Sequence, residues 1–302
     1  MKVGVIGTGS MGRNHVRVYS ELKGIEEIFV FDLNRASMES MKELEVTLCG
    51  SANELLGSVD AVSICVPTKY HLAVAVEAIE KNVHCLIEKP LTMTVDEGTK
   101  LLNSSKNSDI VIGVGHIERF NPIVKEIARI VENPLFVEMK RHYPASSRIT
   151  DSSVVEDLMI HDIDIVFNVL FNKGKYRLYS AGTPDVCKAL VAFNGSVVTL
   201  SASRKSSKKI RSIYIEMEDF TVEGDFMTQE IYSYYKPEKY GIDNERYTQE
   251  NIIEKVLVNK VEPLKVELKT FVDCIQKGVE FPVTPEQALN NLRISDEITK
   301  GF

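Results

Sequence analysis

Short apolar runs alternate with amphipathic segments over the first 118 residues. Runs with the length and composition of buried strands lie at 2–7, 25–32, 46–49, 60–66, 83–88 and 110–115. Between them, apolar residues recur at helical spacing over 11–22, 70–81 and 95–105. Because strands that alternate with helices form a parallel sheet with right-handed crossovers, the pattern predicts an α/β domain over 1–118.

After about residue 120 the pattern changes. Helical stretches near 121–132 and 156–170 precede longer alternating runs at 189–203 and 210–218, and an amphipathic helix is predicted over 285–298. Alternation with a period of two predicts a mostly antiparallel sheet with one open face. We therefore expect a second, α+β domain over 119–302. Since a partner subunit often covers such an open face, we also expect a homo-oligomer, either a dimer or a tetramer.

A glycine-rich turn joins the first predicted strand to the first predicted helix: Gly7-Thr8-Gly9-Ser10-Met11-Gly12. Gly7 permits the tight turn, Gly9 lets a pyrophosphate approach the backbone, and Gly12 brings the helix against the strand. The unpaired N–H groups of the helix N-terminus bind phosphate. Asp32 ends the next strand, where its carboxylate can accept both ribose hydroxyls and repel a 2′-phosphate. The pattern predicts a Rossmann domain that prefers NAD to NADP, and Arg35 could stack on the adenine.

Composition narrows the class of protein. A length of 302 residues suits two domains, and 36 basic against 43 acidic residues argue against a general nucleic-acid surface. No apolar run approaches the roughly 20 residues that cross a bilayer, and the first strand leaves no room for a signal peptide, so we expect a cytoplasmic protein. The five cysteines contain no CxxC pair and are expected to be reduced core residues, without a metal site.

Ligands of open α/β sheets bind at the carboxyl ends of the strands, so the residues after each predicted strand are candidate site residues. Pro67, Thr68 and His71 follow the fourth strand and could line the nicotinamide side of the cofactor, although Thr68 could equally cap the next helix. Lys89, within Glu88-Lys89-Pro90, follows the fifth strand.

Two further polar segments lie beyond these strands. The sixth strand runs into Gly115-His116-Ile117-Glu118-Arg119-Phe120-Asn121-Pro122, where the chain enters the second domain; a hinge with a helix cap at Asn121 is the alternative interpretation. Farther on, Asp157 and His161 stand four residues apart in a helical segment and so share a face. A lone helical histidine is more often structural than catalytic.

Taken together, these motifs resemble the Gfo/Idh/MocA oxidoreductases. The resemblance covers the whole chain and rests on GxGxxG at 7–12, Glu-Lys-Pro at 88–90 and Asp-x-x-x-His-x-x-Asp at 157–164. More narrowly, the segments 115–122, 160–164 and 262–268 are similar to nucleotide-sugar 3-dehydrogenases that act on UDP-N-acetylglucosamine or its uronic acid. One departure is Met159, where the family often has glycine.

The resemblance implies roles for individual residues. His161 fits the general base because the ordinary pKa of histidine lies near physiological pH, Lys89 would stabilise the developing alkoxide, and Asp157 would orient one of them. The substrate-binding residues that we expect are Lys89, Arg119, Asn121, Asp157 and His161. The cofactor-binding residues that we expect are Gly7, Gly9, Ser10, Met11, Gly12, Asp32, Arg35, Pro67, Thr68, His71, Glu88 and Lys89.

The resemblance also implies the reaction, which is NAD-dependent oxidation of the 3-hydroxyl of UDP-N-acetylglucosamine. A PLP aminotransferase could then consume the 3-keto sugar.

The uronic acid would need another cation, for which Arg148 or Arg141 is a candidate. The basic segment 204–211, interpreted as a hairpin-like turn, could hold a diphosphate or simply be solvated, and tyrosines within 232–247 could stack on uracil or pack the sheet. Inositol or hexose dehydrogenation and a non-catalytic NAD-binding regulator are the remaining alternatives.

Overall fold

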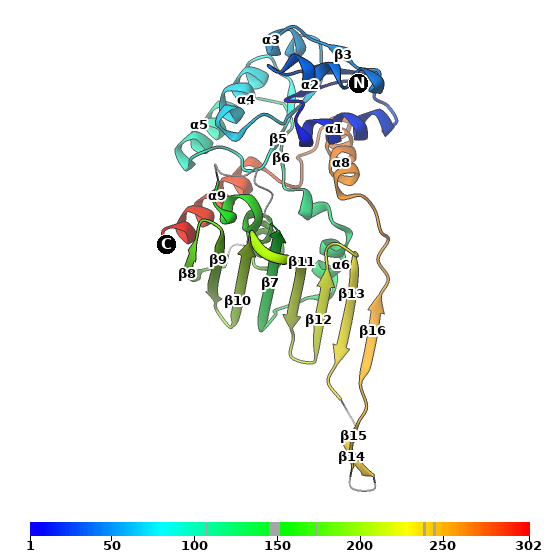
Figure 1. Cartoon of the computed structure of the whole chain (residues 1–302), viewed down its shortest axis with the longest axis vertical. Helices are drawn as coiled ribbons and strands as arrows, with labels where there is room; N and C mark the ends of the chain where they lie inside the picture. The colour runs from blue at the N-terminus through cyan, green and yellow to red at the C-terminus, as the bar shows by residue number, and fades with distance from the viewer. Residues whose placement is uncertain (107, 145–151, 173, 238–239, 244–245) are drawn as a thin grey trace. The chain divides into compact units, whose positions relative to one another are not determined.

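The computed structural model describes residues 1–106, 108–144, 152–172, 174–237, 240–243 and 246–302, and Figure 1 shows the path of the chain. The chain forms two compact units. Unit 1 consists of residues 1–120 and 262–293, and unit 2 of residues 121–261 and 294–302. Among the residues that the structure describes, no helix combines the length and the apolar character that a bilayer-spanning segment requires.

Unit 1 is built on a six-stranded parallel sheet with the order β3-β2-β1-β4-β5-β6. The strands are β1 (Lys2–Ile6), β2 (Glu27–Phe31), β3 (Thr47–Leu48), β4 (Ala61–Ile64), β5 (His84–Glu88) and β6 (Ile112–Gly115). Each lies within one of the six apolar runs of the sequence. β2 and β3 are added on one side of β1, whereas β4, β5 and β6 are added on the other. The carboxyl ends of β1 and β4 therefore flank the position where Rossmann folds bind dinucleotides.

Three helices of unit 1, α2, α3 and α5, begin at residues whose side chains cap them. Thr94 accepts a hydrogen bond from the N–H of Glu97 at the start of α5, and Ser51 and Asn34 cap α3 and α2 in the same way. The helices are α1 (Ser10–Glu21), α2 (Arg35–Glu39), α3 (Ala52–Leu56), α4 (His71–Glu80), α5 (Val95–Ser105), α8 (Pro263–Lys277) and the greater part of α9 (Pro285–Thr299).

Residues 262–293 complete the core of unit 1. Phe271 of α8 and Phe281 are buried in the same apolar cluster as the strands of the parallel sheet. The N–H of Val114 in β6 donates to the carbonyl of Val283 at 3.1 Å. The ring of Phe281 lies so close to Gly113 that a Cβ there would come within 2.5 Å of it. This part of the sequence is therefore structurally continuous with the first 120 residues.

Unit 2 is built on an eight-stranded sheet with the order β16-β13-β12-β11-β7-β10-β9-β8. Every neighbouring pair is antiparallel except β7 and β10. The strands are β7 (Phe136–Pro144), β8 (Tyr176–Thr183), β9 (Val186–Phe193), β10 (Ser196–Ser203), β11 (Lys205–Glu216), β12 (Phe220–Asp225), β13 (Glu230–Tyr235) and β16 (Ile252–Val256). A separate two-stranded sheet, β14 (Tyr240–Asp243) with β15 (Arg246–Gln249), lies at the far end of β13 and β16 in Figure 1.

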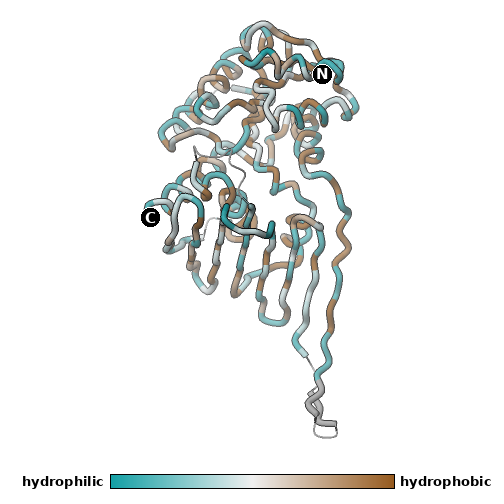
Figure 2. The backbone as a smooth tube through the Cα atoms, viewed as in Figure 1, coloured by the Kyte–Doolittle hydropathy of each residue, from teal (hydrophilic) through white to brown (hydrophobic). Residues whose placement is uncertain are grey.

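One face of the large sheet is buried and the other is open. Inward side chains such as Val137 and Met139 pack against α6 (Pro122–Ile130), against the helical segment 155–170 and against the end of α9. The alternation of apolar and polar residues along the strands can be followed in Figure 2. The prediction of an α/β protein with a Rossmann domain and a mostly antiparallel, open-faced second sheet is confirmed.

Two details differ from the sequence-based expectation or extend it. The continuous strand expected over 189–203 is two strands, because Asn194 and Gly195 form a turn in which Gly195 has a φ of +85°. The helical segment 155–170 consists of π-helical turns at Val155–Met159 and Val166–Leu170 around α7 (Ile160–Ile165). All five cysteines are free thiols, as expected.

Candidate functional site

The three glycines of the β1–α1 turn meet different steric demands. Gly7 has a φ of +92°, and a Cβ on it would lie 2.6 Å from the carbonyl of Cys65. A Cβ on Gly12 would lie 1.8 Å from the carbonyl oxygen of Gly7, so only glycine lets α1 approach the turn. Beside Gly9, by contrast, a Cβ would meet no atom within 4 Å. Gly7 and Gly12 therefore shape the turn, whereas Gly9 leaves open space in front of it.

Asp32 is held in place by the same turn. Its Oδ2 accepts hydrogen bonds from the backbone N–H of Thr8 at 2.6 Å and from the Thr8 hydroxyl at 3.0 Å, and its Oδ1 accepts the N–H of Asn34 at 2.8 Å. Ser37 donates its hydroxyl to the carbonyl oxygen of Thr8 at 2.8 Å. Thr8 and Ser37 could not be recognised as partners of Asp32 from the sequence, because only the fold brings them to the end of β2.

The glycine turn and the end of β2 border a pocket in unit 1 of about 550 Å³. Its walls include six of the residues predicted to bind the cofactor, namely Gly7, Gly9, Ser10, Met11, Asp32 and Pro67. Helix α1 begins at Ser10, and no side chain caps its first N–H groups. Open space beside Gly9, uncapped N–H groups and an oriented carboxylate match the pyrophosphate and ribose of a dinucleotide.

Arg35 and Thr68 lie outside the lining of this pocket. The side chain of Arg35 is 86% exposed and pairs with Glu39 at 3.3 Å, in the first turn of α2. Thr68 begins a short 3₁₀ helix whose N-cap position is held by Pro67, without a side-chain cap. The alternative interpretation of Thr68 as a helix cap is therefore wrong, and its contact with the cofactor stays a prediction.

His71 links two of the loops that follow the strands. Its Nε2 lies 2.9 Å from the carbonyl oxygen of Val66, and its Nδ1 lies 2.9 Å from that of Pro90. Burial lowers the pKa of His71, although the two carbonyls act in the opposite direction. The ring therefore ties the loop after β4 to the loop after β5, and a contact with the cofactor stays a prediction.

Lys89 follows β5 directly and is half-buried. Its backbone N–H donates to Oε2 of Glu88 at 3.2 Å, while Oε1 of Glu88 lies 3.0 Å from Nε2 of His15 in α1. Burial favours the neutral acid, but the hydrogen bond and charge of His15 prevail and lower the pKa of Glu88. Glu88 is therefore an ionised side chain that anchors the residue on which the predicted chemistry depends.

The thiol of Cys65 lies near this pair. His15, Cys65 and Glu88 offer atoms within 4.8 Å of one another, a spacing compatible with a metal ion. Burial and the nearby charge of Glu88 raise the pKa of the Cys65 thiol well above its ordinary value, and metals bind the thiolate. Since His15 and Glu88 already contact one another directly, we assign no metal here.

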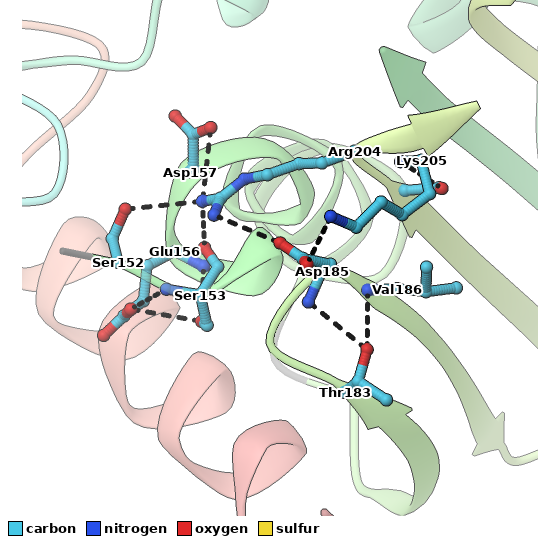
Figure 3. Close-up of polar contacts among 10 residues, drawn as sticks. Ser152, Ser153, Glu156, Asp157, Thr183, Asp185, Val186, Arg204 and Lys205 are labelled. Carbon is cyan, nitrogen blue, oxygen red and sulfur yellow. Dashed lines mark hydrogen bonds and ion pairs between the residues drawn. The ribbon is translucent and has the colours of Figure 1, made fainter. Parts of the chain in front are cut away.

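Unit 2 carries Asp157 and His161 in the segment where a π-helix passes into α7. His161 is buried, whereas the side chain of Asp157 is partly exposed. Figure 3 shows the guanidinium of Arg204 between Asp157 and Asp185. Its Nη2 lies 3.4 Å from Oδ2 of Asp157 and donates to the carbonyl of Ser153 at 2.9 Å. Arg204 is thus a buried cation beside a predicted catalytic residue.

The basic segment 204–211 is not a hairpin turn. Strands β10 and β11 both pair with β7 and lie on opposite sides of it, so Arg204 stands where the chain crosses the end of β7. Arg204 is 5% exposed, and Lys205 pairs with Asp185 at 2.9 Å. The hairpin interpretation is wrong because it assumed that consecutive strands are neighbours. Lys208 and Lys209 of this segment are exposed, and their contact with a diphosphate stays a prediction.

The remaining predicted contacts differ in their surroundings. Asn121 is buried, caps α6 by accepting the N–H of Ile123 at 3.3 Å, and donates to the carbonyl of Phe226 at 3.0 Å, as the structural alternative expects. Arg119 is half-buried in a 3₁₀ turn of unit 1. Arg141 donates from Nε and Nη2 to Oδ1 of Asp162 at 2.9 and 2.6 Å, both side chains being buried, so it joins β7 to α7. Arg148 lies outside the described residues.

Comparison with known proteins shows which family of dinucleotide-binding proteins this chain resembles. The model of the Gfo/Idh/MocA family, an oxidoreductase family with an NAD-binding Rossmann fold, matches residues 1–116. The chain is 33% identical over 244 residues to UDP-N-acetylglucosamine 3-dehydrogenase of Acidithiobacillus ferrooxidans, covering 78% of this chain and 77% of that protein. It is 26% identical over 178 residues to inositol 2-dehydrogenase of Agrobacterium fabrum, covering 55% and 53%.

The similarity extends to solved structures. A structure of the Acidithiobacillus ferrooxidans UDP-N-acetylglucosamine 3-dehydrogenase superposes with a TM-score of 0.88 at 28% identity, covering all of this chain and 97% of the other. The same two-part architecture is therefore shared from end to end. With the glycine turn, Asp32 and their pocket, these matches show that the chain belongs to the Gfo/Idh/MocA family of NAD-binding oxidoreductases.

Proposed function

We propose that this oxidoreductase oxidises the 3-hydroxyl of UDP-N-acetylglucosamine to a ketone with NAD. The observation that carries the proposal is the 33% identity to the Acidithiobacillus enzyme, which covers 78% of this chain. The match to inositol 2-dehydrogenase covers only 55% of this chain at 26% identity, so a free cyclitol is the weaker candidate. The position of Lys89, directly after β5 in the unit that carries the dinucleotide pocket, supports an enzyme over a non-catalytic regulator.

The proposed chemistry separates a proton from a hydride at one carbon. When bound, NAD supplies the hydride acceptor at C4 of its nicotinamide ring. His161 accepts the hydroxyl proton, and Lys89 donates a hydrogen bond to the reacting oxygen as negative charge develops on it. Asp157, which is held by Arg204, orients the base. Glycines 7 and 9, Ser10 and Asp32 would hold the dinucleotide.

The test is the appearance of NADH when purified protein is mixed with NAD and one candidate substrate. The candidates are UDP-N-acetylglucosamine, UDP-N-acetylglucosaminuronic acid and myo-inositol, each with a carbonyl trap because the oxidation of an alcohol by NAD is uphill. Reduction only with UDP-N-acetylglucosamine is the expected result. If NAD were reduced only with the uronic acid or only with the cyclitol, that compound would be the substrate in place of UDP-N-acetylglucosamine. NAD binding without reduction by any of the three would favour the non-catalytic regulator.

Substitutions test the assigned roles. Lys89→Ala and His161→Ala should each lower kcat by at least about a hundredfold, the scale of general acid–base and oxyanion contributions. The His161→Ala variant should bind NAD as the native protein does, measured by calorimetry. Near-native turnover in either variant would remove that residue from the mechanism. Addition of a PLP aminotransferase that consumes 3-keto sugars should draw the reaction forward.

We also propose that the protein is a homo-oligomer. The outer face of the large sheet is open and carries a hollow of about 560 Å³ lined by tyrosines and charged side chains, among them Tyr214, Tyr232 and Lys140. A second copy of the chain that covers this face would bury those rings. The mass of the protein in solution distinguishes a dimer from a tetramer.

A further inference from the structure

A cluster of polar side chains, most of them buried, lies within unit 1 around the end of β5. His15 and Tyr19 come from α1, Cys65 follows β4, Glu88 ends β5, and Glu267 comes from α8. His15 and Glu267 are fully buried and Glu88 is 8% exposed. Polar groups buried to this degree cost free energy unless they are paired, so their arrangement calls for a specific explanation.

The two carboxylates of the cluster have unlike surroundings. Glu88 has His15 at 3.0 Å from Oε1 and accepts the N–H of Lys89 at Oε2. Neither carboxylate oxygen of Glu267 has a hydrogen-bond partner among the described residues. Because a buried anion needs a donor or a cation beside it, the negative charge belongs on Glu88 and Glu267 is a neutral acid. In agreement, burial and the charge of Glu88 raise the pKa of Glu267 well above its ordinary value.

The ionised Glu88 is fixed from two sides. An ionised carboxylate only accepts hydrogen bonds, so Nε2 of His15 must carry the proton in this contact. On the other side, Glu88 pairs with Gly115 of β6, and a Cβ at Gly115 would lie 3.1 Å from Oε1 of Glu88. His15 therefore holds the carboxylate against β6, and the carboxylate in turn accepts the backbone N–H of Lys89.

We propose that His15 and Glu88 form a positioning pair for Lys89, which fixes the backbone of Lys89 and keeps a negative charge close to its ammonium group. This inference rests on the role of Lys89 in the proposed function. The other titratable groups that face Glu88 are His71 from α4 and Glu267 from α8. Since Glu267 is neutral, the carboxylate of Glu88 is the one anion of the cluster formed by the five side chains named above.

Two amide substitutions at His15 provide a matched test. The amide nitrogen of Gln occupies nearly the place of Nε2 and can still donate to Glu88, whereas the side chain of Asn is one methylene shorter and does not reach it. His15→Asn should lower kcat by about tenfold or more, and it should move the alkaline limb of the kcat/KM profile to lower pH. His15→Gln should restore most of both properties. The Kd for NAD should change less than about twofold in either variant.

Tyr19→Phe is the control for disturbance of the cluster itself. It removes only the hydroxyl that lies 2.8 Å from Oγ of Ser63, one turn along α1 from His15. We expect native kcat and a native pH profile from it. If His15→Asn also kept the native kcat and pH profile, the positioning pair would be refuted, provided that Lys89→Ala is inactive. If Lys89→Ala itself kept native turnover, the role of Lys89 in the proposed function would fail instead.

Infrared spectroscopy tests the charge assignment without any reaction. The C=O stretch of a buried protonated carboxylic acid should be present in the native protein, absent from Glu267→Gln and retained in Glu88→Gln. Loss of that band in Glu88→Gln alone would place the proton on Glu88 and overturn the proposal. A bound transition metal that is released by His15→Asn would overturn it as well, because the pair would then serve as ligands. This measurement decides the matter even if a substitution weakens the activity for other reasons.

Discussion

At the scale of single residues, Gly9 and Gly12 belong to one motif but perform different tasks. A Cβ on Gly12 would collide with the carbonyl oxygen of Gly7, whereas Gly9 has a φ of −66° and open space around its Cβ position. Gly12 is therefore required for folding, and Gly9 for the approach of a ligand. A motif of three glycines thus contains two kinds of requirement.

Alanine substitutions should separate the two requirements. Gly12→Ala should lower the free energy of unfolding by about 3 kcal/mol or more, because the backbone must move to relieve the contact. Gly9→Ala should leave the melting temperature within about 2 °C of the native value but weaken NAD binding by roughly tenfold or more. Thermal melts and NAD titrations of both variants measure these effects. A large loss of stability in Gly9→Ala would show that the space beside it is not open.

The neutral acid of Glu267 predicts a pH dependence of stability. Its pKa in the folded state is raised, so the folded protein binds more protons than the unfolded chain between the ordinary pKa of glutamate and the raised one. Stability is therefore lost as the pH rises through that window. Glu267→Gln should be more stable than the native protein at pH 7, and the difference should vanish below about pH 4. Denaturant unfolding of both proteins at a series of pH values measures the difference.

Glu88 should behave in the opposite way, because its folded-state pKa is lowered. Its contribution to stability is present above the ordinary pKa of glutamate and is lost as the pH falls through the lowered value. Glu88→Gln should therefore be less stable than the native protein at pH 7 and approach it in acid. If both Gln variants changed stability in the same direction at pH 7, the assignment of opposite charge states would be wrong.

At the scale of elements, Arg204 fastens the start of the helical segment that carries Asp157 and His161. The guanidinium bonds to the carbonyl of Ser153 and pairs with Asp157, and the N–H of Val154 donates to the carbonyl of Pro184 at 2.7 Å. The π-helical turn at Val155–Met159 begins beside these contacts. Such turns are common at functional sites, and the buried cation of Arg204 helps to anchor this one to the end of β10.

Arg204→Met should leave the charge of Asp157 without its buried partner. We expect a loss of about 3 kcal/mol in unfolding free energy and a fall in kcat larger than the change in KM. Lys205→Met is the matched control, because Lys205 is the next residue and pairs with Asp185 but is 63% exposed. It should cost less than about 1 kcal/mol. Equal effects in the two variants would show that the buried contacts of Arg204 have no special importance.

Much of the fold was predictable because its strands and helices follow local patterns of apolar and polar residues. The six parallel strands coincide with six apolar runs, and α5 spans the predicted helix at 95–105. The pairing of strands was harder to predict. Nothing near Arg204 indicates that β10 and β11 are separated by β7, because that order depends on a strand more than 50 residues earlier in the chain.

The candidate site was predictable where it follows the ends of parallel strands. Gly7, Asp32 and Pro67 line the pocket because each stands in or just after such an end. His15 and Glu267 were missed because polar residues in helices are usually on the surface. A signal did exist, since Glu267 lies beside Leu268 and three residues after Leu264 in the buried stripe of α8. Arg204 was noticed for its charge, but its burial depends on the tertiary structure.

At the scale of the whole molecule, the predicted homo-oligomer can be tested directly by measuring the mass of the protein in solution. The double substitution Tyr214→Glu and Tyr232→Glu would place added negative charge on the open sheet face beside Glu216 and Glu230. We expect the native protein to have the mass of a dimer or a tetramer by light scattering, and the double variant to have a smaller mass. Lys100→Glu, an exposed change on α5 of unit 1, should leave the mass unchanged. A native mass of one chain would refute the oligomer.

Unit 1 is made of two separate segments of the chain, which affects the order in which the protein can fold during synthesis. Its first 120 residues leave the ribosome early, but Phe271, Phe281 and Val283 of its core are synthesised only after the whole of residues 121–261. Until then Gly113 and Val114 lack the ring and the carbonyl group that cover them. The dinucleotide domain therefore begins the sequence but is completed only once residue 293 has been made, so β6 stays uncovered while residues 121–261 are synthesised. An uncovered nascent sheet is prone to aggregation during translation.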